Sequence, residues 1–188
     1  MTTKYLIKNV DVSGVISDIA IENELITAIG SNLQVEGATE FDFTGSVALP
    51  GLVDLHTHLR EPGKEDAETV LSGSQAAARG GFTAISAMAN TSPVADTAGV
   101  VEQVYRLGQS AGLVDVFPVG AVTQGIQGEH LAEIGAMADS AARVRVFSDD
   151  GNCVFDPLLM RRALEYIKKF DGVIAQHAQE PRLTQASQ

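Results

Sequence analysis

The 188-residue sequence has a single cysteine, Cys153, and no tryptophan. One cysteine excludes a disulfide within the chain, and such low usage is typical of proteins from a reducing cytosol. Basic residues are also few, with 13 lysines and arginines against 24 aspartates and glutamates, for a formal net charge of −11. Nucleic-acid binding normally requires a basic surface. We therefore predict no nucleic-acid partner.

Long apolar segments are missing too. No run approaches the roughly 20 apolar residues that cross a bilayer, and the first residues lack the apolar core of a secretory signal. We expect a cytoplasmic protein with no membrane association. The remaining composition, 45% hydrophobic and 20% charged, is that of an ordinary globular protein.

Residues 1–50 predict a small β domain. Short segments rich in β-branched and aromatic residues alternate with glycines, a pattern typical of strands and turns. The expected strands are 5–7, 10–12, 16–21, 25–29 and 41–43. These segments are too short to build a large core, so we expect a small β-sandwich layer that packs on something else.

Residues 51–188 predict a second domain of alternating strands and helices. Such alternation is typical of an α/β protein with a parallel sheet. Apolar strands are expected to end at 58, near 89, near 122, at 147 and at 177, with helices at 66–79, 97–111, 129–140 and 156–170. The pair Asp156–Pro157 is a strong helix start, because aspartate caps the first turn and proline suits its first position.

Residues suited to metal chemistry follow these strands. His56 and His58 come after the first, Asn90 after the second, the Asp149–Asp150 pair after the fourth and His177 after the fifth. In open sheets and barrels of this kind, the carboxyl ends of the strands form the functional site. Residues far apart in sequence are therefore expected to converge.

His56 and His58 form the most informative pair. In a strand, residues i and i+2 point to the same face, so both imidazoles can reach one ion, and imidazole suits zinc. The apolar run 49–55 behind them is expected to be buried. Asp54, just before the pair, is either an ordinary strand residue or a group that orients a ligand.

Four motifs resemble those of the amidohydrolase superfamily, and within it the dihydroorotases of the longer bacterial type. They are PGLVDLHTHLREPG at 50–63, NTSP at 90–93, SDDG at 148–151 and HAQE at 177–180. The resemblance implies a (β/α)8 barrel of which this chain holds about five of eight units. Family members continue with a further histidine ligand and an aspartate that this sequence lacks. We therefore expect a truncated chain with no catalytic group of its own and little turnover alone.

The resemblance also implies a site for two zinc ions. His56 and His58 would bind the first and His177 the second, with Asp150 bridging them and Asp149 as the alternative bridge. The implied small-molecule reaction interconverts dihydroorotate and N-carbamoyl-aspartate in pyrimidine biosynthesis. Arg60 offers a bidentate fork for the substrate carboxylate, and Asn90 adds a donor beside it.

Two alternatives stay open. A hydantoinase or allantoinase type would keep the chemistry, but its substrates lack the ring carboxylate that Arg60 is suited to bind. A non-catalytic scaffold, acting as a homo-oligomer or with the transcarbamoylase of the same pathway, would hide the apolar face of an incomplete barrel.

Overall fold

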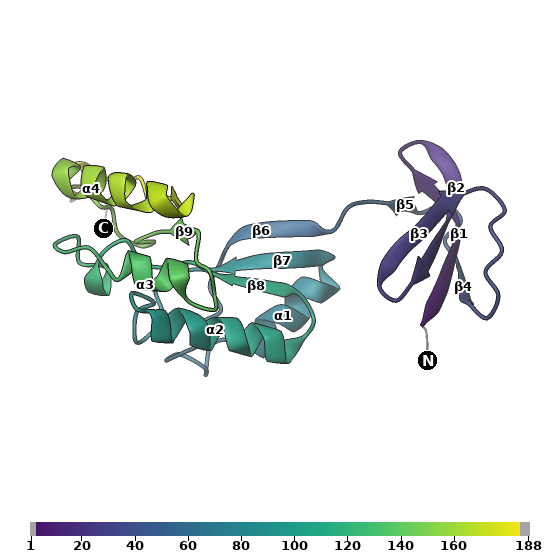
Figure 1. Cartoon of the computed structure of the whole chain (residues 1–188), viewed down its shortest axis with the longest axis horizontal. Helices are drawn as coiled ribbons and strands as arrows, with labels where there is room; N and C mark the ends of the chain where they lie inside the picture. The colour runs from purple at the N-terminus through teal and green to yellow at the C-terminus, as the bar shows by residue number, and fades with distance from the viewer. Residues whose placement is uncertain (1–2, 185–188) are drawn as a thin grey trace. The chain divides into compact units, whose positions relative to one another are not determined.

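A computed structural model describes residues 3–184. The chain forms two compact units, Met1–Pro50 and Gly51–Gln188, both drawn in Figure 1. The first is all β, and the second alternates strands and helices, as the sequence predicts for an α/β chain. Among the described residues, no helix combines the length and apolarity needed to cross a bilayer.

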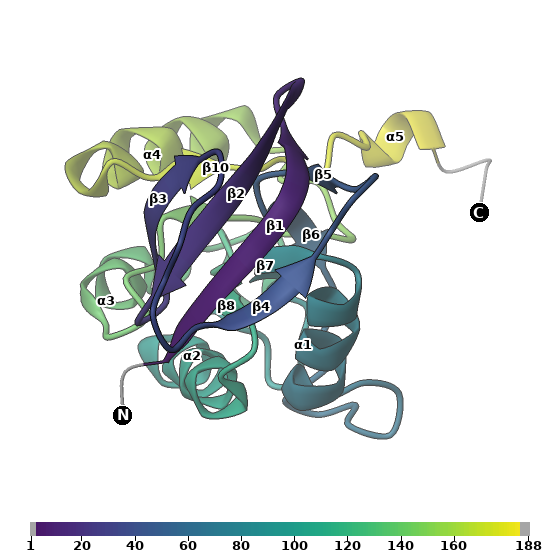
Figure 2. The same ribbon diagram turned by 90° about the vertical axis from the view of Figure 1, so that its right-hand side faces the viewer.

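The first unit is a single five-stranded sheet (Figure 2). Its strands are β1 (Lys4–Val12), β2 (Val15–Glu22), β3 (Leu25–Gly30), β4 (Thr39–Asp42) and β5 (Val47–Ala48). The order is β3-β2-β1-β4, with β5 pairing further along β1. Of the small β-sandwich layer expected for this unit, the described residues form a single sheet, which all five strands join.

A β-bulge explains why β1 reads as two segments in the sequence. Ile7 pairs with Ile19 and Val10 with Ser17, so β1 uses one residue more than β2 between these pairs. Asn9 takes a left-handed conformation there, with φ of 58°. Its backbone N–H donates to Asp18 Oδ1 at 3.0 Å. One bulged strand thus replaces the two that the sequence predicts.

Asp18 is a buried carboxylate of this sheet. Replacing Asp18 with asparagine is expected to destabilise the first unit by about 3 kcal/mol. The reason is that hydrogen bonds to a charged group contribute roughly 1.5–3 kcal/mol each. Lys8 Nζ lies 2.9 Å from its Oδ2, and Leu33 N donates to the same oxygen at 3.0 Å. The measurement is hydrogen exchange of β1 and β2 amides in urea. The exposed Glu40 provides the control, because Glu40→Gln should change stability by less than about 0.5 kcal/mol.

Acid should remove the difference in stability between wild type and Asp18→Asn. The Lys8 ammonium, with the Asn9 and Leu33 amides, holds the pKa of Asp18 below its ordinary value. The stabilisation is therefore complete above the unfolded-state pKa of about 4 and is lost as the pH falls through the lower folded-state pKa. A difference between wild type and Asp18→Asn that persists unchanged to pH 2 would contradict this account.

The second unit contains two small parallel sheets. The first has the order β6-β7-β8 and the second pairs β9 with β10. The strands are β6 (Leu52–Thr57), β7 (Phe82–Ala87), β8 (Asp115–Pro118), β9 (Val146–Phe147) and β10 (Val173–Ile174). A bridge between Gly120 and Phe147 links the segments after β8 and at β9. Residues 51–184 form no closed barrel.

Helices follow the strands in the predicted order. They are α1 (Val70–Arg79), α2 (Ala98–Ala111), α3 (Ile134–Asp139), α4 (Pro157–Ile167) and α5 (Pro181–Thr184), with short 3₁₀ turns at Gln124–Ile126 and Lys168–Phe170. Helix α4 begins as predicted, with Asp156 accepting from Leu159 N at 2.7 Å. Helix α1 begins four residues late, because Thr69 and Ser72 form a capping box. The strand predicted to reach His177 ends at Ile174.

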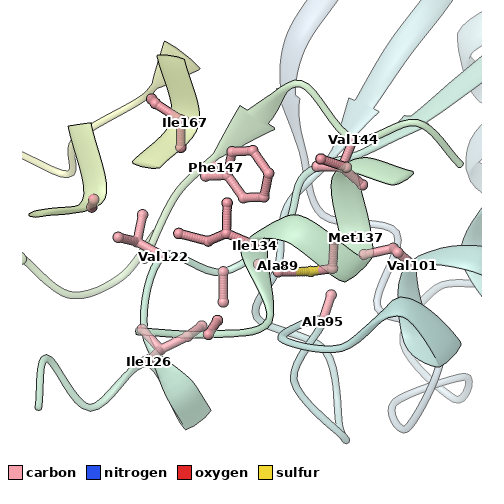
Figure 3. Packing of buried hydrophobic residues seen from close by; sticks show 14 of the residues in the cluster. Ala89, Ala95, Val101, Val122, Ile126, Ile134, Met137, Val144, Phe147 and Ile167 are labelled. Atoms are coloured by element: carbon pink, nitrogen blue, oxygen red, sulfur yellow. The ribbon is translucent and has the colours of Figure 1, made fainter. Parts of the chain in front are cut away.

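Two apolar clusters hold this unit together. Helices α1 and α2 lie along one face of β6-β7-β8 (Figure 1), where Ile85 and Val116 pack with Val70 and Val104. The larger cluster surrounds Phe147 and Ile134 near the carboxyl ends of the strands (Figure 3). It therefore supports the loops that follow β7, β8 and β9.

The opposite face of β6-β7-β8 is exposed. Val53, Leu55 and Phe117 are 57%, 72% and 53% exposed and line one apolar cavity of about 500 Å³. The prediction that the run 49–55 is buried is therefore wrong for this structure. Strand β6 pairs only with β7 among the described strands, so its outer edge has no strand partner within residues 51–184.

Candidate metal centre

A second β-bulge shapes the end of β6. Asp54 pairs with Ile85 and Thr57 with Ala87, so three steps along β6 match two along β7. Bulges leave one residue without its ladder bond and re-aim side chains near functional sites. Asp54 Oδ1 accepts the His56 N–H at 3.0 Å. Asp54 therefore stabilises the bulge that carries His56 through its backbone.

The two histidines meet one aspartate. Asp150, in the loop after β9, has a side chain only 8% exposed. Its Oδ1 lies 3.3 Å from His56 Nε2, and its Oδ2 lies 3.4 Å from His58 Nε2. The potential ligand atoms of these three residues all lie within 4.8 Å of one another, a spacing that allows them to hold a metal ion.

His177 reaches the same carboxylate from the segment after β10. Its Nδ1 lies 3.2 Å from Asp150 Oδ1, and its Nε2 lies 3.0 Å from Gln179 Oε1. It is not one of the three residues whose ligand atoms lie within mutual reach. Asp150 is thus the residue that joins all three imidazoles.

The adjacent Asp149 has a different environment. It is 1% exposed, and its Oδ1 accepts from Val122 N at 2.8 Å and Thr123 N at 3.0 Å. The Thr123 hydroxyl donates to its other oxygen. Burial raises the pKa of Asp149, while these hydrogen bonds oppose that rise. Asp149 is therefore engaged with the loop after β8, whereas Asp150 is the carboxylate that faces the three imidazoles.

Thr123 is a residue that sequence reasoning missed. It is fully buried, and its Oγ1 also accepts from Gly128 N at 2.9 Å. A single threonine after an apolar run carries no distinctive pattern. Its contact with Asp149 appears only when two loops 26 residues apart are folded together.

The two residues expected to bind substrate differ in their contacts. Asn90 Oδ1 lies 3.0 Å from His58 Nδ1, and its Nδ2 lies 3.5 Å from Asp150 Oδ2. Arg60, two residues after His58, is half-buried with φ of 61°, an unusual conformation for a bulky residue. Within residues 3–184 its guanidinium has no hydrogen-bond or ion-pair partner, so it remains available for an anion.

The donor set fits a metal cation. A neutral imidazole has one N–H and one lone pair. His177 Nε2 faces the oxygen of Gln179, so a ring protonated at Nε2 presents the lone pair of Nδ1 to Asp150 Oδ1. Two acceptors repel one another unless a proton or metal ion joins them. Imidazoles with a carboxylate are the ligands that zinc accepts.

Comparisons with known proteins agree on one family. The dihydro-orotase-like family model matches residues 45–188. A dihydroorotase of Streptomyces coelicolor is 62% identical over 99% of this chain, and one of Leifsonia xyli is 68% identical over 92%. The chain spans only 44% and 39% of these relatives' own lengths.

Solved structures show the same fold at lower identity. An L-hydantoinase of Arthrobacter aurescens superposes with a TM-score of 0.80 at 23% identity, over 99% of this chain and 43% of that one. A dihydropyrimidinase of Brevibacillus agri gives 0.71 at 22% identity, over 98% of this chain and 43% of that one. At this identity the likeness concerns the fold alone.

Proposed function

This chain belongs to the dihydro-orotase-like family, and we propose that it provides most of the metal site of a zinc-dependent dihydroorotase. In that reaction, water adds across a ring amide of dihydroorotate, the C–N bond breaks, and N-carbamoyl-aspartate forms; the reverse closes the ring in pyrimidine biosynthesis. The observation that carries the proposal is the convergence of His56, His58 and His177 on Asp150.

In this proposal His56 and His58 would hold one cation and His177 a second, with Asp150 as the carboxylate that they would share. Two zinc ions per site are proposed, since a carboxylate can offer one oxygen to each. Bound zinc acidifies water and polarises the carbonyl under attack. We propose, as the family resemblance implies, that the proton-transferring aspartate is not among these 188 residues, so none of this chain's own residues is assigned that role.

Arg60 is proposed to bind the substrate carboxylate. A guanidinium presents two parallel N–H donors that match the two oxygens of a carboxylate. The unpaired state of Arg60 among the described residues supports this role. Hydantoin and allantoin lack a ring carboxylate and would leave the guanidinium unpaired, so we propose dihydroorotate as the preferred substrate.

We propose that residues 51–188 are part of a (β/α)8 barrel and that residues 1–50 are its small β domain. The exposed face of Val53, Leu55 and Phe117 and the unpaired edge of β6 support this, because large apolar surfaces are normally covered. In a polypeptide of the relatives' full length, further strand–helix units would cover them. A cytoplasmic location, a homo-oligomer and a transcarbamoylase partner stay predictions.

A substrate panel tests the function. A polypeptide of the relatives' full length that carries this chain is assayed with dihydroorotate, N-carbamoyl-aspartate, hydantoin and allantoin. Turnover of the first two is expected, at a kcat/KM at least about 100-fold above that for the others, because the missing bidentate pair corresponds to about 3 kcal/mol. Faster turnover of hydantoin would instead establish the hydantoinase alternative, and no turnover of any of them would favour the scaffold.

A further inference from the structure

Asn90 contacts the proposed metal ligands rather than a free surface. Its side-chain oxygen faces His58 Nδ1 at 3.0 Å, and its side-chain nitrogen faces Asp150 Oδ2 at 3.5 Å. These two residues lie 32 and 60 positions away in the sequence. One amide therefore connects the histidine pair at the end of β6 with the aspartate after β9.

The direction of these hydrogen bonds follows from their chemistry. A carboxylate oxygen only accepts, so the atom of Asn90 that faces Asp150 has to be the NH₂ group. The amide oxygen must then face His58, and an amide oxygen cannot donate. This orientation favours a proton on His58 Nδ1, and in the neutral ring Nε2 then keeps its lone pair.

That lone pair points toward the carboxylate. His58 Nε2 lies 3.4 Å from Asp150 Oδ2, the same oxygen that Asn90 faces. Asn90 thus disfavours the His58 tautomer that would hydrogen-bond to Asp150 through Nε2. It favours the tautomer whose Nε2 is available to a cation.

The backbone holds Asn90 in place for this role. The segment after β7 is fastened to the end of β6, because Met88 N donates to Thr57 O at 2.9 Å. Ala89 is fully buried, and its carbonyl accepts from Thr91 N at 2.9 Å and Ala95 N at 3.0 Å. The amide is therefore presented from a rigid loop.

We propose that Asn90 is a positioning residue for the metal site: its amide fixes His58 as the Nδ1–H tautomer and orients Asp150. This inference rests on the proposed function and deepens it. Partners in the outer shell of a metal site typically contribute 10- to 100-fold to metal affinity. The amide keeps one hydrogen and one lone pair, so contact with substrate is compatible with this role.

The test separates a positioning role from a purely substrate-binding one. Asn90→Leu, which keeps the approximate shape of the side chain, and Arg60→Lys are prepared in a polypeptide of the relatives' full length. Zinc affinity is measured by competition with a chromogenic chelator. Asn90→Leu is expected to bind zinc about 10- to 100-fold more weakly, whereas Arg60→Lys should stay within about twofold of wild type and raise only KM.

A second measurement does not depend on metal. In the metal-free protein at a pH where the ring is neutral, ¹⁵N NMR of His58 is expected to show the proton on Nδ1 in wild type and not predominantly there in Asn90→Leu. Far-UV circular dichroism of both variants checks that the fold is retained. Excess zinc should restore turnover of Asn90→Leu but leave the KM of Arg60→Lys unchanged.

The outcomes distinguish the two levels of the proposal. If wild type binds zinc and Asn90→Leu binds it equally well with an unchanged His58 tautomer, the positioning role is overturned while the proposed function stands. If wild type itself binds no divalent cation, both are overturned. Weaker zinc binding in Asn90→Leu, with the shifted tautomer, supports the inference whichever substrate the panel identifies.

Discussion

Asp150→Ala is expected to reduce dihydroorotase kcat/KM by about 10³-fold or more and to remove bound metal. Asp150 contacts His56, His58 and His177 through ring nitrogens at 3.2–3.4 Å, so it is the residue common to both proposed cations. Lewis-acid stabilisation is worth several kcal/mol, and each 1.36 kcal/mol corresponds to a factor of ten. A loss of about 4 kcal/mol therefore gives the expected reduction.

The measurement combines steady-state kinetics with metal analysis of the purified protein. Asp139→Ala is the matched control, because Asp139 is an exposed carboxylate at the end of α3. It should retain metal and activity. Removal of metal from wild type by a chelator should also abolish turnover, and added zinc should restore it. Full metal content and activity in Asp150→Ala would refute the proposed centre.

Asp149→Ala is expected to act on stability, lowering the free energy of unfolding by about 4 kcal/mol. The carboxylate accepts from Val122 N, Thr123 N and the Thr123 hydroxyl. Both of those residues are fully buried, so alanine leaves buried donors without an acceptor, at about 1–3 kcal/mol each. Urea denaturation in the presence of a chelator measures this effect without the stabilisation that bound metal adds.

Two further variants sharpen this prediction. Asp149→Asn keeps one acceptor oxygen and should cost about half as much, and Thr123→Val should cost about 2 kcal/mol through loss of its hydroxyl contacts with Asp149 and Gly128. Folded Asp149→Asn should still bind metal with wild-type stoichiometry. Loss of metal without loss of stability would instead assign the bridging role to Asp149.

Local sequence patterns were sufficient to predict those parts of the structure that depend on residues close together in the sequence. The alternation of strands and helices after residue 50 follows from apolar runs separated by amphipathic segments. Asp156–Pro157 marks the start of α4, because cap and proline act within a single turn. The split of β1 near Asn9 was also visible, although pairing with β2 turns it into a bulge within one strand.

Burial could not be predicted in the same way. The apolar run 49–55 has the composition of a covered strand, yet Leu49 and Leu55 are 76% and 72% exposed. Burial depends on which other elements lie against a strand, and of the strands that the structure describes β7 alone pairs with β6. An apolar pattern indicates that a strand face is suited to burial, but it does not indicate which element, if any, covers that face.

The sequence by itself determined the family, the strand–helix order and the residue types available at the site, because these are written in motifs of a few adjacent residues. Tertiary structure alone decided that Asp150 faces the histidines, that Asp149 holds the loop of Thr123, and that Asn90 joins His58 to Asp150. Adjacent aspartates look alike in sequence. Their roles differ because the folded chain brings different groups to each. Hydrogen-bond donors 26 positions away contact Asp149, whereas the imidazole of His56, 94 positions away, contacts Asp150.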